Sequence, residues 1–232
     1  KLPIYKVGSH DTASAVAAVP APESGDWAYL SAGTWALLGA EIDSPEISDD
    51  SRRESFTNEG GLDGKIRFLT NIMGSWLFQE SRRVWNEAGK NLSFADMEKM
   101  ALATAPCQSF INPNDATFAA PGDMPERIRE FCRRTGQIVP ETDGEVLRTI
   151  YDSLALYFAG KLATLAKLRN VRYAAFNVVG GGTRDRLLMQ LTADAMKLPV
   201  IAGPVEATAV GNLLGQAIAA KKVENLAAAC YA

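Results

Sequence analysis

The stretch V-V-G-G-G-T at residues 178–183 decides the fold class of this chain. An apolar run over Ala174–Val179 predicts a buried strand, which leads into three consecutive glycines. A helix is predicted directly after them, over Arg184–Met196. Because glycines let the backbone approach a ligand closely and a helix start offers unpaired N–H groups, this turn can hold an anion or a polar ring. A strand, a glycine turn and a helix in this order indicate an α/β fold.

Two common nucleotide-binding motifs do not fit the glycine turn. A dinucleotide fingerprint, G-x-G-x-x-G, would need glycine at position 185, where the chain has Asp185. A P-loop would need Lys-Ser or Lys-Thr after the glycines, and the nearest imitation, Gly64-Lys65, is followed by Ile66. The residues alone leave two interpretations open: a ligand-binding turn, or a tight β–α turn that binds nothing.

Further helices are predicted on both sides of this unit. Apolar residues at helical spacing mark four helices upstream, and the last of them carries a broad apolar stripe. A long irregular loop with Asn-Pro and Pro-Gly steps is predicted over 105–121. Downstream we expect a short strand and a helix with proline in its first turn. The predicted segments are Ile72–Ala88, Phe94–Ala103, Pro125–Thr135, Asp143–Arg169, Val200–Ile201 and Pro204–Ala220.

The N-terminal part of the chain predicts short strands and turns instead. Two pairs of strand-like runs are each separated by a glycine-bearing turn, which is typical of hairpins. A further strand and a small helix are expected before them. These segments are Ile4–Val7, Thr12–Ala18, Trp27–Ser31 with Trp35–Glu41, and Phe56–Gly61 with Lys65–Leu69. Together with the later strand–helix alternation, they predict one α/β domain with a mixed sheet.

Two polar turns near the N-terminus are candidates for chemistry. Asp11 follows the first predicted strand, in the turn G-S-H-D-T at residues 8–12, where α/β proteins place ligands. A carboxylate there could take a proton from a hydroxyl that attacks a phosphoryl group, or it could simply cap the next helix. The hairpin tip S-A-G-T at residues 31–34 offers backbone N–H groups and two hydroxyls to phosphate oxygens, or it is a turn without a ligand.

In their order along the chain, these turns and the helical insertion between them resemble the C-terminal domain of the FGGY carbohydrate kinases. The stretches that carry the resemblance span most of the chain. They are S-H-D-T-A-S-A-V (9–16), Y-L-S-A-G-T-W (29–35), N-E-G-G (58–61), N-I-M-G (71–74), T-G-Q-I-V-P-E-T-D (135–143), D-S-L-A-L (152–156), V-G-G-G (179–182) and I-A-G-P-V-E-A (201–207). The resemblance implies a ribonuclease-H-like (actin-like ATPase) fold with a mixed sheet flanked by helices. It also implies that residues 1–232 are the C-terminal nucleotide-binding domain of a two-domain sugar kinase.

The resemblance further implies roles for residues at matching positions. Asp11 would be the catalytic base that deprotonates the sugar hydroxyl. Sugar contacts would come from His10, Asp11, Thr12 and Asn71, and ATP contacts from Thr34, Gln79, Gly180, Gly181 and Gly182. Without the resemblance, Asn71 fits better as a helix N-cap before Ile72, and Gln79 as part of a solvated helix face.

The activity implied by the resemblance is ATP-dependent phosphorylation of a ketose, with Mg²⁺ as the metal ion and O1 of L-rhamnulose as the expected acceptor. Another ketose or polyol, such as xylulose or fuculose, is an alternative acceptor, and a non-catalytic actin-like nucleotide-binding module is an alternative function. Members of the family carry a sugar-binding domain before the Ser-His-Asp turn, whereas eight residues precede Ser9 here. We therefore expect the N-terminal domain to be absent from this chain, and the chain by itself to be inactive.

The composition bears on which partners the chain can bind and on the cellular compartment it is expected in. The net charge is -3 and the pI about 5.4, so the chain lacks the basic footprint of a nucleic-acid-binding protein. No apolar run reaches the length of about 18 residues that a membrane span needs. The three cysteines are widely spaced and odd in number, which predicts free thiols in a reducing cytoplasm; they are Cys107, Cys132 and Cys230. One histidine and no paired cysteines argue against a zinc site.

Overall fold

The computed structural model describes residues 4–5, 7–8, 10–20 and 26–226. Among these residues, six strands form one sheet in the order third, fourth, second, first, fifth, sixth. The strands are β1 (Ala28–Ala32), β2 (Trp35–Ile42), β3 (Thr57–Gly60), β4 (Ile66–Met73), β5 (Phe176–Val179) and β6 (Val200–Ala202). The pairs β1–β2, β2–β4 and β3–β4 are antiparallel, whereas β1–β5 and β5–β6 are parallel. The predicted mixed sheet and both predicted hairpins are confirmed.

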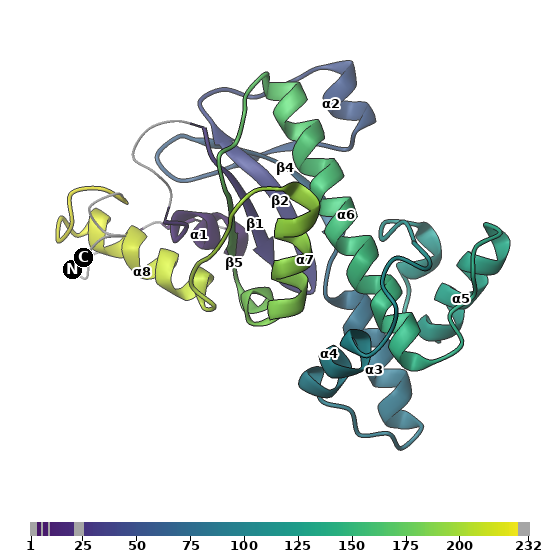
Figure 1. Cartoon of the computed structure of the whole chain (residues 1–232). Coiled ribbons are helices and arrows are strands. Elements are labelled where there is room, and N and C mark those ends of the chain that lie inside the picture. The colour runs from purple at the N-terminus through teal and green to yellow at the C-terminus, as the bar shows by residue number, and fades with distance from the viewer. Residues whose placement is uncertain (1–3, 6, 9, 21–25, 227–232) are drawn as a thin grey trace.

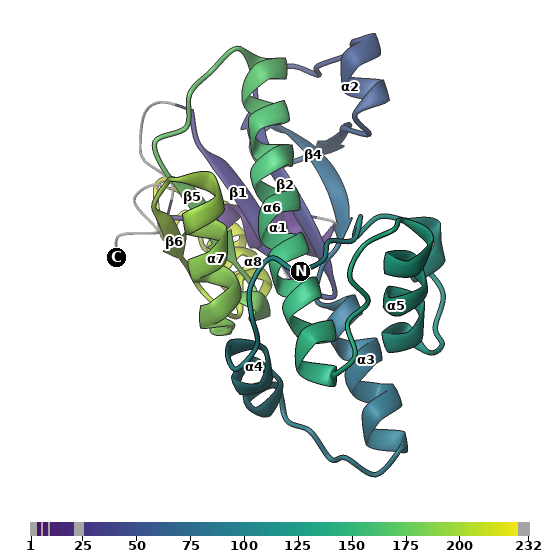
Figure 2. The same ribbon diagram turned by 45° about the vertical axis from the view of Figure 1, so that its right-hand side comes forward.

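Helices lie on both faces of the sheet. They are α1 (Asp11–Ala17), α2 (Asp49–Arg53), α3 (Trp76–Glu87), α4 (Phe94–Leu102), α5 (Met124–Arg134), α6 (Asp143–Arg169), α7 (Arg186–Met196) and α8 (Ala207–Ala219), with short 3-10 turns at Ala116–Phe118 and Gly181–Arg184. Figure 1 shows α6 and α7 on one side of the sheet and α1 with α8 on the other. Figure 2 shows α3, α4 and α5 grouped around the end of α6 that extends past the sheet.

The longest helix, α6, has a start and a stop signal in its sequence. At its N-terminus the Thr142 hydroxyl accepts the N–H of Glu145, and the Glu145 carboxylate accepts the N–H of Thr142, a reciprocal capping box. At its C-terminus Asn170 takes the left-handed conformation, with φ 52°, that ends helices. The prediction of a helix over Asp143–Arg169 is confirmed.

Alternation along the strands divides the core between the two faces of the sheet. On the α6–α7 face, Leu30, Leu38 and Ile72 belong to the larger hydrophobic core. On the opposite face, Tyr29 and Val179 pack with α1 and α8 in a smaller core. The apolar side chains of α1 and α8 therefore cover only part of this face of the sheet. The rest of the face can carry polar residues.

The predicted strand over Ile4–Val7 is wrong for its described residues, none of which is part of the sheet. Strand propensity needs a neighbouring strand to pair with, and both edges of the sheet lie elsewhere, at β3 and β6. Ile4 is accordingly 93% exposed. Val7 lies against Gly215 of α8 instead, where a side chain at Gly215 would meet it at 3.5 Å.

The predicted helix over Ile72–Ala88 begins later than expected, at Trp76. β2 is eight residues long and pairs with β4 over its whole length, from Trp35 opposite Met73 to Ile42 opposite Ile66. This pairing keeps Asn71 in the strand, so its alternative interpretation as a helix cap is also wrong. Helical spacing of apolar residues at the start of the segment could not show this, because a long partner strand decides where β4 ends.

The predicted helix over Pro204–Ala220 also begins later, at Ala207. The chain before it still follows the edge of the sheet: the N–H of Gly203 donates to the Val178 carbonyl at 2.7 Å, and the N–H of Gly180 donates to the Pro204 carbonyl at 2.9 Å. Pro204 therefore supports the glycine turn through its carbonyl and does not occupy the first turn of α8.

Two observations bear on the predictions from composition. Cys107 and Cys132 are free thiols, and Cys230 lies outside the described residues. A search of the described helices for a segment long and apolar enough to cross a bilayer finds none.

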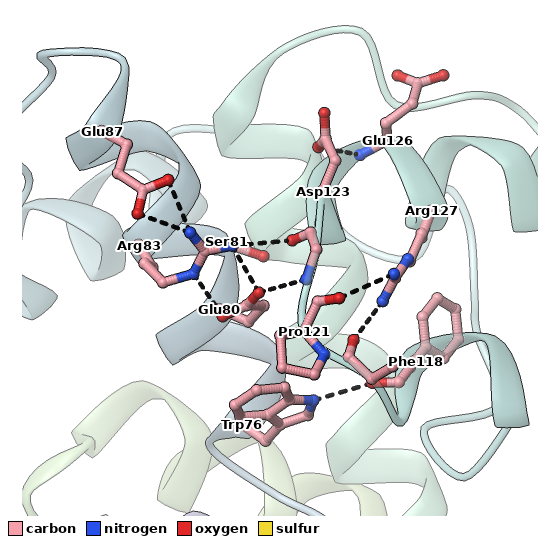
Figure 3. Close-up of polar contacts among 12 residues, drawn as sticks. Trp76, Glu80, Ser81, Arg83, Glu87, Phe118, Pro121, Asp123, Glu126 and Arg127 are labelled. Carbon is pink, nitrogen blue, oxygen red and sulfur yellow. Dashed lines mark hydrogen bonds and ion pairs between the residues drawn. The ribbon is translucent and has the colours of Figure 1, made fainter.

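The buried carboxylate of Glu80 connects α3 to the long loop before α5 (Figure 3). Glu80 of α3 is 3% exposed and binds the Arg83 guanidinium at 2.8 Å and the backbone N–H of Gly122 at 2.5 Å. The indole N–H of Trp76 donates to the carbonyl of Phe118 in the same loop at 2.9 Å. These contacts hold the predicted irregular loop against α3.

Glu80→Gln in the full-length protein is expected to lower stability at pH 7 by about 1.5–3 kcal/mol, the usual value of hydrogen bonds to a charged group. The hydrogen bond from Arg83 holds the pKa of Glu80 below its usual range in the folded state. The carboxylate therefore contributes its full stability above its unfolded-state pKa of about 4.3 and loses it as the pH falls through the lower folded-state pKa. Thermal unfolding between pH 7 and pH 3 checks this, because the wild type and the variant should converge at the acid end.

The matched control is Glu87→Gln, because Glu87 binds the same Arg83 but its side chain is 66% exposed. Its effect on the melting temperature should be smaller and should fall with added salt. A Glu80→Gln deficit that stays constant down to pH 3 would show that the loss comes from packing and not from the charge.

Candidate functional site

A cleft of about 840 Å³ opens on the α1–α8 face of the sheet. It is bounded by the start of α1, the β1–β2 hairpin, β4 and β3, the glycine turn after β5, and the segment that leads into α8. Residues predicted from the sequence that line it are His10, Asp11, Thr12, Ser31, Thr34, Asn71, Gly180 and Gly181. Segments far apart in the chain thus meet in one cavity, whereas Gln79 and Gly182 lie outside its lining.

Asp11 is the first residue of α1, and its side chain is 76% exposed. The residue that caps α1 is His10, whose Nδ1 accepts the N–H of Thr12 at 3.2 Å. Both sequence interpretations of the local backbone at Asp11 are therefore wrong: Asp11 neither ends a strand nor is the N-cap. Its carboxylate accepts the Thr12 N–H at 2.7 Å, lies 2.9 Å from Nδ1 of His10, and remains open to the cleft. Ser9, in the same turn, lies outside the described residues.

The tip of the β1–β2 hairpin is fixed to the start of α3. The carbonyl of Gly33 accepts the hydroxyl of Ser75 at 2.8 Å, and the Thr34 carbonyl accepts the N–H of Trp76 at 3.1 Å. The Thr34 hydroxyl donates to Oε1 of Gln79 at 3.3 Å. Gln79 therefore reaches the cleft through Thr34. The N–H of Gly33 donates to a backbone carbonyl, so this group of the tip is not free for phosphate as the hairpin pattern predicted.

The three glycines of the predicted turn have different environments. Gly180 has φ 92°, and a Cβ on it would lie 2.8 Å from the Ala32 carbonyl oxygen, so both its conformation and its packing require glycine. A Cβ on Gly182 would lie 2.6 Å from Cβ of Ala32, which places Gly182 against β1 and away from the cleft. Gly181 has open space around its Cα and lines the cleft.

The helix after the glycines begins two residues later than predicted, at Arg186. A 3-10 turn over Gly181–Arg184 intervenes, and the Asp185 carboxylate caps α7 by accepting the N–H of Leu188 at 2.9 Å. The hydroxyl of Tyr151 also donates to Asp185, at 2.9 Å. The cap thus binds one of the N–H groups at the helix start that the sequence offered to a ligand.

Asn71 is an exposed residue of β4, opposite Leu37 of β2. Its position is held by Asn114 from the long loop, whose side-chain amide donates to the Asn71 carbonyl at 2.8 Å and accepts the N–H of Met73 at 2.8 Å. The backbone of Asn71 is therefore fixed while its side chain lines the cleft.

Several cleft residues were not predicted as site residues. They are Ala15, Trp35, Leu37, Glu59, Val205, Glu206 and Thr208, whereas Ala32 and Gly33 also line the cleft but belong to the predicted hairpin tip. Trp35 and Leu37 follow from alternation once β2 is known to pair with β4, because they share the face of Asn71. Glu59 and Glu206 lie inside stretches that carry the family resemblance, but their burial and partners are tertiary facts.

The lining of the cleft is acidic. Asp11, Glu59 and Glu206 are its carboxylates, and among the described residues that line it none is a lysine or arginine. A polyanionic ligand in this cleft therefore depends on backbone N–H groups, hydroxyls and a bound cation for neutralisation of its charge.

The glycine turn, the Asp11 turn and the hydroxyl-bearing hairpin tip thus border one cleft over a mixed six-stranded sheet. The model of the FGGY family of carbohydrate kinases, C-terminal domain, matches residues 28–220. The chain therefore belongs to this family.

The curated relatives that the chain resembles include rhamnulokinases. A rhamnulokinase from Bacteroides thetaiotaomicron is 45% identical over 226 residues, which are 97% of this chain and 46% of that protein. A rhamnulokinase from Enterobacter sp. is 46% identical over 213 residues, covering 92% of this chain and 42% of that protein. The chain thus spans less than half the length of these relatives.

Solved structures confirm the predicted fold. A gluconate kinase from Lactobacillus acidophilus superimposes with a TM-score of 0.66 at 14% identity, over 94% of this chain and 43% of that one. A xylulose kinase from Rhodospirillum rubrum superimposes with a TM-score of 0.64 at 20% identity, also over 94% of this chain and 43% of that one. The ribonuclease-H-like (actin-like ATPase) fold implied by the sequence stretches is therefore correct.

Proposed function

We propose that the full-length protein transfers the γ-phosphoryl group of ATP to O1 of L-rhamnulose, and that this chain supplies the ATP site and the catalytic base. The single observation that carries the proposal is the meeting of Asp11, Thr34 and Gly181 in one cleft of a chain 45% identical to a rhamnulokinase. The cytoplasm is the proposed compartment, in keeping with the free thiols of Cys107 and Cys132.

In this proposal the cleft binds its ligands in a fixed order across the sheet. Gly181, with the backbone shaped by Gly180 and Gly182, packs against the adenosine. Thr34, held by Gln79, contacts the phosphates at the hairpin tip. His10, Thr12 and Asn71 contact the sugar, and of these Asn71 lies on β4, on the side of the hairpin away from the glycine turn. The strand order β5, β1, β2, β4 supports this direction, because it separates the glycine turn from Asn71.

The proposed reaction needs a base beside the attacking oxygen. The Asp11 carboxylate takes the proton of the sugar hydroxyl as its oxygen attacks the phosphorus in line with the leaving ADP oxygen. Because Asp11 is exposed on the cleft and fixed by the Thr12 N–H, it can meet a hydroxyl without moving α1. His10 accepts the same Thr12 N–H through its Nδ1, so it helps to fix the turn that carries Asp11.

Mg²⁺ fits this cleft as a companion of ATP. The lining offers carboxylate, amide and hydroxyl oxygens, the donors that Mg²⁺ prefers, and Asp11 is one of its carboxylates. Mg²⁺ usually keeps several waters and binds through substrate phosphates, so few protein ligands are required. When bound, it would neutralise the phosphate charge that the acidic lining does not.

The acceptor is tested with a panel of ketoses and the full-length enzyme. We expect kcat/KM for L-rhamnulose to exceed that for L-fuculose or D-xylulose by about 100-fold, because a site built around specific hydroxyls rejects sugars that place them differently. A coupled ADP-release assay measures this ratio. Equal values for the three sugars would contradict the acceptor assignment while leaving the kinase assignment intact, and no ADP release with any polyol or ketose would contradict both.

The chain by itself is proposed to bind ATP weakly and not to turn over sugar. Its proposed partner is the N-terminal sugar-binding domain of the same protein, since the relatives are more than twice its matched length. Closure of two domains normally excludes water and completes such a site.

A further inference from the structure

We propose that Glu59 is a further sugar-binding residue of the cleft and that the buried Arg67 positions it. The inference rests on the proposed kinase function and deepens it, because it names a residue that contributes to the choice of sugar. Glu59 would bind a hydroxyl group of the sugar other than the hydroxyl that is phosphorylated.

The position of Glu59 across the sheet assigns it to the sugar end of the cleft. The glycine turn follows β5, the hairpin tip joins β1 and β2, and Asn71 lies on β4. Glu59 lies on β3, the next and last strand in this direction. It lines the same cavity as Asp11 and Asn71 and is separated from the glycine turn by three strands of the sheet. A ligand group that reaches Glu59 therefore belongs to the molecule at the Asn71 end.

Arg67 is a buried arginine that forms an ion pair with Glu59. It is 1% exposed, on the face of the sheet where Tyr29 and the cleft lie, and it pairs with Glu59 across the β3–β4 ladder. Its Nη2 donates to Oε2 of Glu59 at 2.9 Å, and its Nε donates to the Gly60 carbonyl at 3.0 Å. Burying a guanidinium is unfavourable unless it is paired, and the Glu59 carboxylate is the partner that offsets this cost.

The ion pair of Arg67 and Glu59 does not satisfy every buried polar group around it. Nη1 of Arg67 and the hydroxyl of Tyr29 are both buried without a hydrogen-bond partner among the described residues. Glu41 also pairs with Arg67 in the β2–β4 ladder, and burial raises the pKa of its carboxyl group. Arg67 nevertheless makes its ion pair with Glu59, the carboxylate of the two that lines the cleft.

The free oxygen of Glu59 is the binding group. Oε2 is held by Arg67, whereas Oε1 has no donor among the described residues, and the side chain is 31% exposed. A carboxylate fixed by one oxygen can accept a hydroxyl with the other, and an acceptor that is already oriented loses little entropy on binding. The same negative charge disfavours entry of phosphate into this end of the cleft.

The test compares Glu59→Gln with Glu41→Gln in the full-length enzyme. Glu59→Gln should raise KM for the sugar about 10-fold to 100-fold, equivalent to about 1.4–2.7 kcal/mol, with KM for ATP unchanged and kcat within a few-fold. Glu41→Gln removes the other carboxylate opposite Arg67 but lies outside the cleft lining, so both KM values should stay at the wild-type level. The sugar used is whichever ketose the wild type phosphorylates best.

Arg67 is tested as a positioning residue. Arg67→Met should raise KM for the sugar as Glu59→Gln does, and Arg67→Lys, which keeps the charge, should restore part of the affinity. If Glu59→Gln does not fold, Glu59→Asp keeps the ion pair partner and withdraws the carboxylate by one methylene, and it should also raise KM for the sugar. A folded Glu59 variant with wild-type KM for the sugar overturns the inference. Failure of the kinase assignment is separate, because it would appear as an inactive wild type.

Discussion

Asp11→Asn in the full-length enzyme is expected to lower kcat by about 10²-fold to 10⁴-fold, the usual contribution of a positioned general base. The amide keeps the shape of the side chain and an oxygen for the Thr12 N–H, so α1 should still form. It cannot take the proton of the attacking hydroxyl, so the loss should fall on kcat, with KM for ATP near the wild-type value. Steady-state kinetics with saturating sugar and ATP measures both constants.

Asp49→Asn is the matched control for this variant. Asp49 is the first residue of α2, as Asp11 is the first residue of α1, and its side chain is 87% exposed, outside the cleft lining. The substitution therefore repeats the same chemical change at the same helix position without touching the site, and kcat should not move. A folded Asp11→Asn enzyme that phosphorylates its sugar at the wild-type rate would remove Asp11 from the chemistry.

Elements with local signals could be predicted from the sequence, and elements set by distant partners could not. The bounds of α6 were correct, because Thr142 and Asn170 mark its two ends. The β1–β2 hairpin was correct because two apolar runs flank a short turn. In contrast, the segment around Ile4 has strand propensity but no strand beside it, and the end of β4 depends on a pairing with β2 that begins at Trp35, in another part of the chain.

The candidate site divides in the same way. Asp11, Thr34 and Gly181 could be predicted as candidates because each lies in a short turn with a recognisable residue type and the order of the turns resembles a family, and all three line the cleft. The ion pair of Glu59 and Arg67 beside the cleft could not be predicted, because nothing in the local pattern shows that an arginine on β4 is buried or which of two opposing carboxylates it binds. Predicting this ion pair would require the register of β2, β3 and β4, which places Glu41 and Glu59 on either side of Arg67.

Glycine at position 211 of α8 lets this helix approach the backbone of α1, the helix that begins at Asp11. A Cβ on Gly211 would lie 1.7 Å from the Ser14 carbonyl oxygen and 2.7 Å from its carbonyl carbon. Both are backbone atoms, so no side-chain rotation can make room, and α1 and α8 would have to move apart. Because a catalytic group displaced by about 1 Å can cost about 10²-fold in rate, the consequence should reach the chemistry.

Gly211→Ala is therefore expected to lower both stability and activity. Overpacking of this kind costs about 1–3 kcal/mol or more, against a gain of about 0.5–1 kcal/mol from replacing glycine within a helix. Thermal unfolding should show a lower melting temperature, and kcat should fall by about 10-fold to 100-fold in the fraction that remains folded.

Gly160→Ala is the control, because Gly160 lies within α6 and a Cβ there would meet nothing within 4 Å. The same substitution should there raise stability by about 0.5–1 kcal/mol and leave kcat unchanged. If Gly211→Ala melted with the wild type and kept its kcat, the contact between α1 and α8 could not be what holds Asp11 in place. If it melted lower but kept its kcat, α1 would keep its place over the sheet while α8 moved away from it.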